Sequence, residues 1–140
     1  MIDREPLLDD PVLVALPPDH PYATRKSIGL DLLASEAWIA APLAGLPLTA
    51  LRAAVGSGFT PQVRYEGEDF AAVLSLVEAG LGIALLPRLA TGKASPGVTI
   101  RPLVGALLNR RVYTAQLRSR PVTAASAFAR LIRPVGDAPD

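Results

Sequence analysis

The side chains best suited to acid–base chemistry or ligand binding gather in one short stretch, which contains Glu66, Glu68, Asp69 and Phe70. A carboxylate in this position could serve as a general acid or base. No carboxylate–histidine pair and no nucleophile–base pair completes such a site in the sequence, so ligand binding is favoured over catalysis. If the chain were an enzyme, Glu68 or Asp69 would be the first candidates and His20 the next.

The only histidine, His20, lies in a predicted turn, Asp19-His20-Pro21, and the sequence has no cysteine. Disulfides and thiolate metal sites are therefore excluded. One histidine leaves little material for a metal site or for a histidine-based catalytic triad. We interpret His20 as a turn or surface residue, with a place at a pocket rim as the alternative. We expect no metal and no cofactor.

The elements that position the carboxylates are predicted to be a strand, a helix and a second strand within Gln62–Pro87. Residues 62–66 alternate polar and apolar side chains, as a half-buried strand does. Asp69 is a good helix N-cap, because its carboxylate can accept a hydrogen bond from a first-turn amide. Gly80 stands where a left-handed residue ends a helix, and residues 82–86 form an apolar strand. The apolar helix face consists of Phe70, Val73, Leu74 and Val77.

A second strand, Ala37–Ala41, contains the only tryptophan, Trp38, which we expect to be a core anchor rather than a ligand platform. The loops that follow the two strands, residues 40–45 and 66–70, both lead to predicted helix N-termini. Ligands of α/β proteins bind beyond the carboxyl ends of such strands, where free amides suit an anionic group. The carboxylates in the second loop could satisfy those amides themselves, so Asp69 is either simply a cap or part of a binding site.

The 140 residues are enough for one domain with a substantial core, and a composition of 50% hydrophobic and 19% charged residues is typical of a globular protein. Other predicted elements are strands at Val12–Leu16, Val98–Pro102 and Arg110–Leu117, a helix from Pro47 and a final helix from Pro121. Alternating strands and helices indicate an α/β fold with a mostly parallel sheet. No apolar run reaches the roughly 18 residues of a membrane span and no signal peptide is evident, so we expect a cytoplasmic protein without membrane contact.

An ordered set of motifs identifies a resemblance. The segments are DPVLVALPPDHPYA, LDLLASEAWIA, GFTPQVRYEGEDFAAVLSLVEAGLGIALLPRLA, VTIRPL and RRVYTAQLRSR. In this order and at this separation they resemble the effector-binding domain of LysR-type transcriptional regulators, from about Leu7 to Ile132. LPPDHPYA and LVEAGLGIALLP are the most diagnostic of the segments.

The resemblance implies a type 2 periplasmic-binding-protein-like fold, in which two α/β lobes enclose a small-molecule effector. Residues 1–10 would be a crossover from the first lobe, residues 11–104 the second lobe, and residues 105–140 a strand and helix that return to lobe one. The rest of lobe one and the winged helix-turn-helix domain are not in the sequence, which therefore looks like a fragment. We expect a homo-oligomer whose contact with DNA depends on that absent domain.

The resemblance also implies which residues of lobe two contact the effector. Carried over by position, these are Ala41, Pro42, Leu43, Glu68, Asp69 and Phe70. Effectors of this family are often small organic or aromatic acids, and their binding is transmitted by lobe closure and subunit repacking. The alternatives are an enzyme of dehydratase type on the same scaffold and a solute-binding protein.

Overall fold

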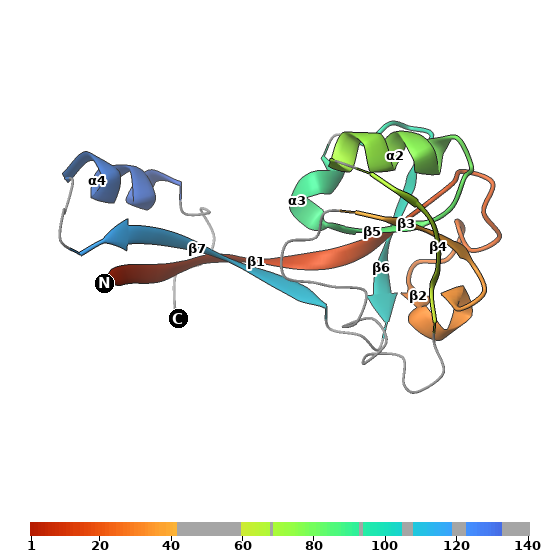
Figure 1. Ribbon diagram of the computed structural model, residues 1–140, viewed down its shortest axis with the longest axis horizontal. Coiled ribbons are helices and arrows are strands. Elements are labelled where there is room, and N and C mark those ends of the chain that lie inside the picture. The colour runs from red at the N-terminus through yellow and green to blue at the C-terminus, as the bar shows by residue number, and fades with distance from the viewer. Residues whose placement is uncertain (42–59, 68, 93, 105–107, 119–122, 133–140) are drawn as a thin grey trace. The chain divides into compact units, whose positions relative to one another are not determined.

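The computed structural model describes residues 1–41, 60–67, 69–92, 94–104, 108–118 and 123–132 (Figure 1). The chain divides into two compact units. The larger unit is Pro11–Arg110, and the smaller one combines Met1–Asp10 with Arg111–Asp140. The predicted helix that begins at Pro47 lies outside the described residues.

A mixed sheet forms the centre of the larger unit. Across the sheet, the strands are β2 (Ile28–Gly29), β6 (Thr99–Val104), β1 (Ile2–Leu16) and β5 (Ala84–Pro87). β1 is antiparallel to both of its neighbours, so that Val14 pairs with Leu85 on one side and with Arg101 on the other. β2 and β6 are parallel. The predicted strand at Val12–Leu16 is therefore confirmed, but it begins ten residues earlier than the sequence indicated, at Ile2.

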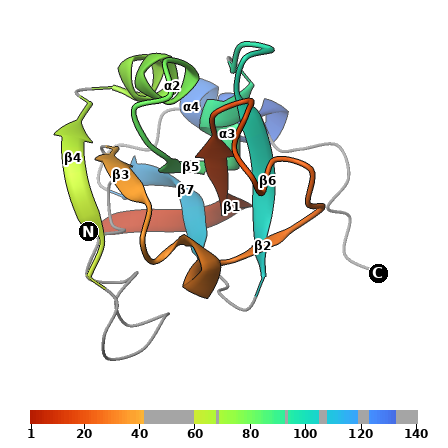
Figure 2. The ribbon, with the colours of Figure 1, turned by 90° about the vertical axis from the view of Figure 1, so that its right-hand side faces the viewer.

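A second pair of strands, β3 (Ala37–Ala40) and β4 (Gln62–Glu66), is parallel (Figure 2). On the other side of β3, Ile83 forms a parallel bridge with Trp38. The Ile83 N–H donates to the Ala37 carbonyl at 2.9 Å, and the Ile39 N–H donates to the Ile83 carbonyl at 2.8 Å. The segment that leads into β5 thus continues the parallel pairing, as the predicted strand–helix–strand unit requires.

Helix α2 (Phe70–Glu78) joins β4 to this segment, and both of its ends follow the sequence prediction. Gly80 has φ +77°, the left-handed conformation that ends a helix. The Leu81 N–H donates to the Leu76 carbonyl at 3.1 Å and the Gly80 N–H to the Val77 carbonyl at 2.9 Å. These two bonds form a Schellman motif. The buried helix residues are Val73, Leu74 and Val77, as predicted.

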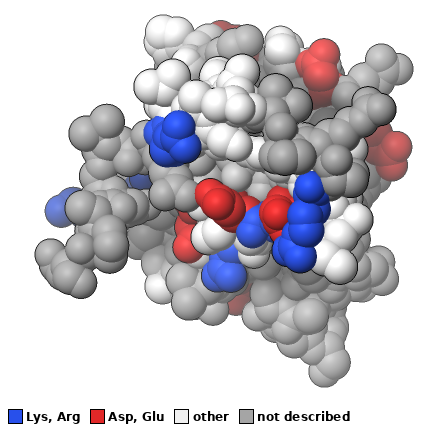
Figure 3. Space-filling model, turned by 90° about the vertical axis from the view of Figure 1, so that its left-hand side faces the viewer, with Lys and Arg blue, Asp and Glu red and all other residues white. Residues whose placement is uncertain are grey.

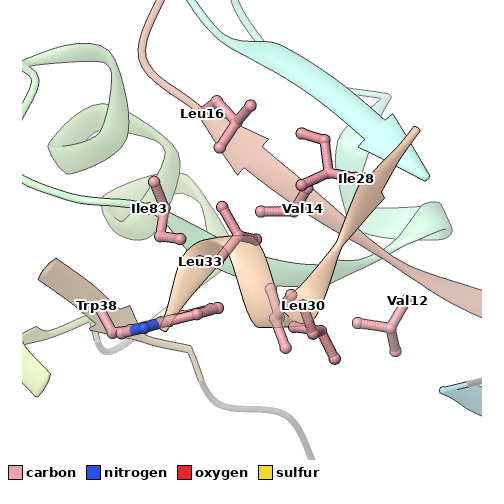
Figure 4. Close-up of a cluster of buried hydrophobic side chains, with 9 residues drawn as sticks. Val12, Val14, Leu16, Ile28, Leu30, Leu33, Trp38 and Ile83 are labelled. Carbon is pink, nitrogen blue, oxygen red and sulfur yellow. The ribbon is translucent and has the colours of Figure 1, made fainter. Parts of the chain in front are cut away.

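Two clusters of buried apolar side chains form the core of the larger unit. The first core cluster lies between the β1 sheet and the short helix η1 (Leu30–Leu33), and Trp38 belongs to it with 1% of its surface exposed (Figure 4). Trp38 is therefore a core anchor, as predicted. The second core cluster lies around α2 and consists of Ala15, Ile39, Val73, Leu74, Val77, Ala84, Leu86 and Val98. Helix α3 (Arg88–Thr91) directly follows β5.

In the smaller unit, the first part of β1 pairs with β7 (Asn109–Leu117), and α4 (Thr123–Leu131) follows. The strands are antiparallel, because Met1 is bonded to Arg118 while Asp9 lies opposite Arg111. Acidic residues of β1 form ion pairs with arginines of the β7 segment, and Figure 3 shows red and blue side chains close together on one face. The hydrogen bond from Arg118 is the main cause that lowers the pKa of Asp3.

The observed elements confirm the predicted mixed α/β fold class. None of the helices among the described residues has the length and apolarity needed to cross a bilayer.

Candidate functional site

The loops after β3 and β4 leave from the same edge of the structure. The two strands are parallel, and Ala40, the last residue of β3, is paired with Glu66, the last residue of β4. Both strands therefore end at this edge. The Gly67 N–H then donates to the Ala40 carbonyl at 3.0 Å. This bond fixes the start of one loop against the start of the other, as the predicted position of the binding site requires.

Asp69 caps helix α2. Its backbone is extended, and its Oδ1 atom accepts a hydrogen bond from the Ala72 N–H at 2.8 Å. One amide of the first turn is therefore already satisfied by the chain, and the carboxylate places negative charge at the positive end of the helix dipole. The side chain is exposed, so the remaining carboxylate oxygen can still meet a ligand.

Phe70 and Ala41 are both partly buried, and both pack against the second core cluster. Phe70 is the first residue of α2, and Ala41 directly follows β3. The described parts of the two loops thus contribute apolar side chains that pack against the same cluster, next to the carboxylate of Asp69. This combination suits a small ligand with an apolar body and a few polar groups.

Gly67 is a site residue that sequence reasoning missed. A Cβ atom built on it would lie 2.3 Å from Val73 Cγ2 and 3.2 Å from the Val73 backbone nitrogen. Only glycine permits this close approach of the loop to the first turn of α2. The signal in the sequence was the glycine between the strand end at Glu66 and the cap at Asp69.

The structure describes three of the six predicted site residues: Ala41, Asp69 and Phe70. It brings Ala41 and Phe70 to the same core cluster, and Asp69 directly precedes Phe70. Pro42, Leu43 and Glu68 lie outside the described residues.

His20 lies elsewhere, in the turn between β1 and β2. The turn is confirmed, since the His20 N–H donates to the Pro17 carbonyl at 3.1 Å and the His20 carbonyl accepts from Ala23 at 2.9 Å. The expectation of a surface side chain, which was the other part of that interpretation, is wrong, because only 7% of the side chain is exposed. Its Nε2 atom lies 3.3 Å from Glu36 Oε1. Within the part of the chain that the structure describes, no group of three His, Asp or Glu side chains is arranged to hold a metal ion.

Comparison with known families gives a match over almost the whole chain. The family model described as the LysR substrate binding domain matches residues 2–137.

Curated relatives are transcriptional regulators. The HTH-type transcriptional regulator TtuA of Agrobacterium vitis is 29% identical over 133 residues, which cover 93% of this chain and 41% of TtuA. The transcriptional dual regulator GltC of Bacillus subtilis is 32% identical over 97 residues, covering 68% of this chain and 32% of GltC. The chain therefore spans about a third to two fifths of the length of these relatives.

Solved structures show the same fold. The Synechocystis PCC6803 CcmR regulatory domain in complex with 2-PG superimposes with a TM-score of 0.78 at 24% identity, over 94% of this chain and 65% of that one. The effector binding domain of QuiR in complex with shikimate gives a TM-score of 0.73 at 20% identity, over 94% of this chain and 63% of that one.

Proposed function

This chain belongs to the LysR substrate-binding domain family, and on that premise we propose that it senses a small metabolite for a LysR-type transcriptional regulator. The observation that carries the proposal is the pairing of Ala40 with Glu66 and the bond from Gly67 to Ala40, which bring two loops to one edge. The effector contacts from this chain are Ala41, Pro42, Leu43, Glu68, Asp69 and Phe70.

The proposed effector is a small organic or aromatic acid. Two neighbours of the same fold were solved as complexes with small ligands, 2-PG and shikimate. The apolar surface of Ala41 and Phe70 suits the body of such a molecule. First-turn amides of α2 beyond the one that Asp69 occupies suit its acidic group.

In this proposal, residues 11–104 act as the second lobe, residues 1–10 cross over from the first lobe, and residues 105–140 return to it. The division of the chain after Asp10 and after Arg110 supports this assignment. An effector that binds the closed form more tightly than the open one shifts the population towards closure. Closure changes how subunits of a homo-oligomer pack, and no chemical step is needed.

The wider context belongs to the same proposal. The regulator acts in the cytoplasm and contacts DNA through a winged helix-turn-helix domain outside these 140 residues. The relative TtuA is named an HTH-type transcriptional regulator, which supports that role.

A pair of variants on one helix tests the site. Phe70→Ala removes the apolar contact at the loop, whereas Leu76→Ala removes a partly buried side chain from the same core cluster at the other end of α2. Both should lower the free energy of unfolding, by about 1–3 kcal/mol each. Only Phe70→Ala should weaken effector binding, by about tenfold or more.

The measurement is a calorimetric titration with shikimate, 2-PG and a panel of other small organic acids. Equal affinity in both variants would remove Phe70 from the site. If none of the acids binds the unchanged protein at millimolar concentration, the proposed effector class is wrong.

A further inference from the structure

Helix α4 of the smaller unit turns its apolar side chains away from the strand on which it lies (Figure 1). The Ser126 hydroxyl donates to Gln116 Oε1 of β7 at 3.2 Å, so this side of the helix faces the strand. At about 100° per residue, Phe128 and Leu131 fall roughly on the opposite side of α4. They are 61% and 82% exposed. The exposed residues that form this apolar stripe are Ala124, Ala125, Phe128, Leu131 and Ile132.

The apolar stripe has small side chains at its start and large ones at its end. Ala124 precedes Leu131 by seven residues, and Ala125 precedes Ile132 by the same interval. Seven residues are close to two helical turns, so each alanine shares a side of the stripe with one large residue. Phe128 lies midway between the alanines and the large residues. The stripe therefore consists of two rows, each running from small to large, with an aromatic ring at the centre.

This order of sizes fits a second copy of the same stripe in the antiparallel direction. A twofold axis at Phe128 would place the two phenylalanines together and Leu131 of each copy opposite Ala124 of the other. Ile132 would meet Ala125 in the same way. In a parallel pair, alanine would face alanine at one end and leave a gap there. The antiparallel direction also brings opposite ends of the two helix dipoles together.

Charge favours the same partner. The stripe contains no ionisable side chain, so two stripes can meet without bringing like charges together. The only charged residue from Thr123 to Ile132 is Arg130. It follows Ser126 by four residues, which puts it on the β7 side of the helix rather than in the stripe. A partner recognised by its charge would need the opposite arrangement, with Arg130 among the contact residues.

We propose that α4 is a self-pairing helix, which packs antiparallel against α4 of a second copy of this chain through the apolar stripe. The association removes Phe128, Leu131 and Ile132 from water, and the alanines let the helices approach closely. The pairing requires no effector. A failed titration with organic acids would therefore leave it standing, and failure of the pairing would leave effector binding standing.

Exchanging a small and a large residue tests the antiparallel contact. Ala124→Leu adds apolar surface, but it should weaken self-association by about fivefold or more, because two large side chains would then compete for one space. Leu131→Ala should also weaken it, through lost burial. The variant with both changes again places a leucine opposite an alanine. It should associate at least about fivefold more tightly than the product of the single effects.

Analytical ultracentrifugation over a concentration series measures these dissociation constants. Both positions are exposed in the single chain, so the chain should still fold after either change. Tighter association of Ala124→Leu, as expected for non-specific contact between apolar surfaces, would overturn the proposal. Single effects that simply multiply in the double variant would overturn it as well.

Cysteine cross-linking tests the direction of the pair, and the chain has no cysteine of its own to interfere. A mixture of Ala125→Cys and Ile132→Cys proteins should form a disulfide-linked dimer under mild oxidation. Ala125→Cys alone should not, because its two copies would lie roughly 10 Å apart along the helices, beyond the reach of a disulfide. Ala115→Cys, at an exposed alanine of β7 outside the stripe, gives the background rate of random collision.

Two results of the cross-linking experiment would contradict the proposal. Rapid dimer formation by Ala125→Cys alone would show that the helices pair in the parallel direction. A mixture that cross-links no faster than the Ala115→Cys control would show that the two stripes do not meet.

Discussion

At the scale of single residues, Asp69 has two possible partners, the amides of its own helix and a bound acid. The structure shows the first, with Oδ1 bonded to the Ala72 N–H. An acidic ligand would be repelled by the same carboxylate. Substitutions that keep or remove the cap, and keep or remove the charge, therefore distinguish the two roles.

We expect Asp69→Ala to lower the free energy of unfolding by about 1 kcal/mol, whereas Asp69→Asn, which still caps, should change it by only a few tenths. Urea denaturation measures both. If Asp69 is chiefly a cap, Asp69→Asn should bind an organic acid as well as the unchanged protein or more tightly. Loss of binding in Asp69→Asn would instead make the carboxylate a direct ligand contact.

The sequence predicts some of these residues well because their roles are local. Asp69 and Gly80 are identified by their positions at the two ends of one helix, and the structure confirms both. The burial of His20 could not be predicted, because it depends on the packing of segments that are distant in the sequence, and Glu36, which lies near its ring, is sixteen residues further along the chain. Gly67 was missed for a similar reason, since its constraint is the nearness of Val73 in space.

At the scale of elements, the end of α2 is a backbone requirement rather than a packing one. Gly80 has a positive φ, and a Cβ atom added to it would meet no atom within 4 Å. Gly92 also has open space around it, but its φ is −63°, at the C-cap of α3. The two glycines therefore differ in backbone conformation alone.

We expect Gly80→Ala to lower the free energy of unfolding by about 1–2 kcal/mol, because an L-residue is strained in the left-handed conformation. Gly92→Ala should leave the free energy of unfolding unchanged or raise it by up to about 1 kcal/mol, because alanine lowers the conformational entropy of the unfolded chain. Thermal unfolding of the two variants checks this. Equal effects would mean that the left-handed conformation at Gly80 is not what destabilises the first variant.

The alternation of strands and helices along the sequence predicts the directions of some strands but not of others. Alternating strands and helices indicate parallel pairs, and β2–β6 and β3–β4 are parallel. β1 is antiparallel to β5 and β6, and this could not be read from alternation because no short crossover connects it to either neighbour. The start of β1 at Ile2 could not be predicted either, because the first part of the strand, which pairs with β7, is rich in polar residues.

At the scale of the whole molecule, the two units differ in how much apolar surface they bury. Both core clusters belong to the larger unit, whereas Asp10 is the single buried residue among those described in the smaller one. A two-stranded sheet with one helix is marginal without further cover. The large exposed apolar side chains of the smaller unit are Met1, Ile2, Tyr113, Leu117, Phe128, Leu131 and Ile132.

We therefore expect the chain to self-associate through the smaller unit, because association would remove this surface from water. Analytical ultracentrifugation at increasing concentration should show a rising average mass. Leu131→Lys, at a side chain that is 82% exposed, should weaken the association. Leu89→Lys, at a 59% exposed leucine of the larger unit, should leave it unchanged. A monomer at every concentration would contradict the expectation.

Trp38 gives the protein an optical reporter of its own. It is the only tryptophan, it is 1% exposed, and it lies in the strand that joins Glu36 to Ala41. The emission of a single buried indole reports on its immediate surroundings, so any rearrangement of β3 would alter the colour or intensity of the fluorescence. Under the proposed function, the binding of an effector at the end of this strand can thus be followed in real time without a label.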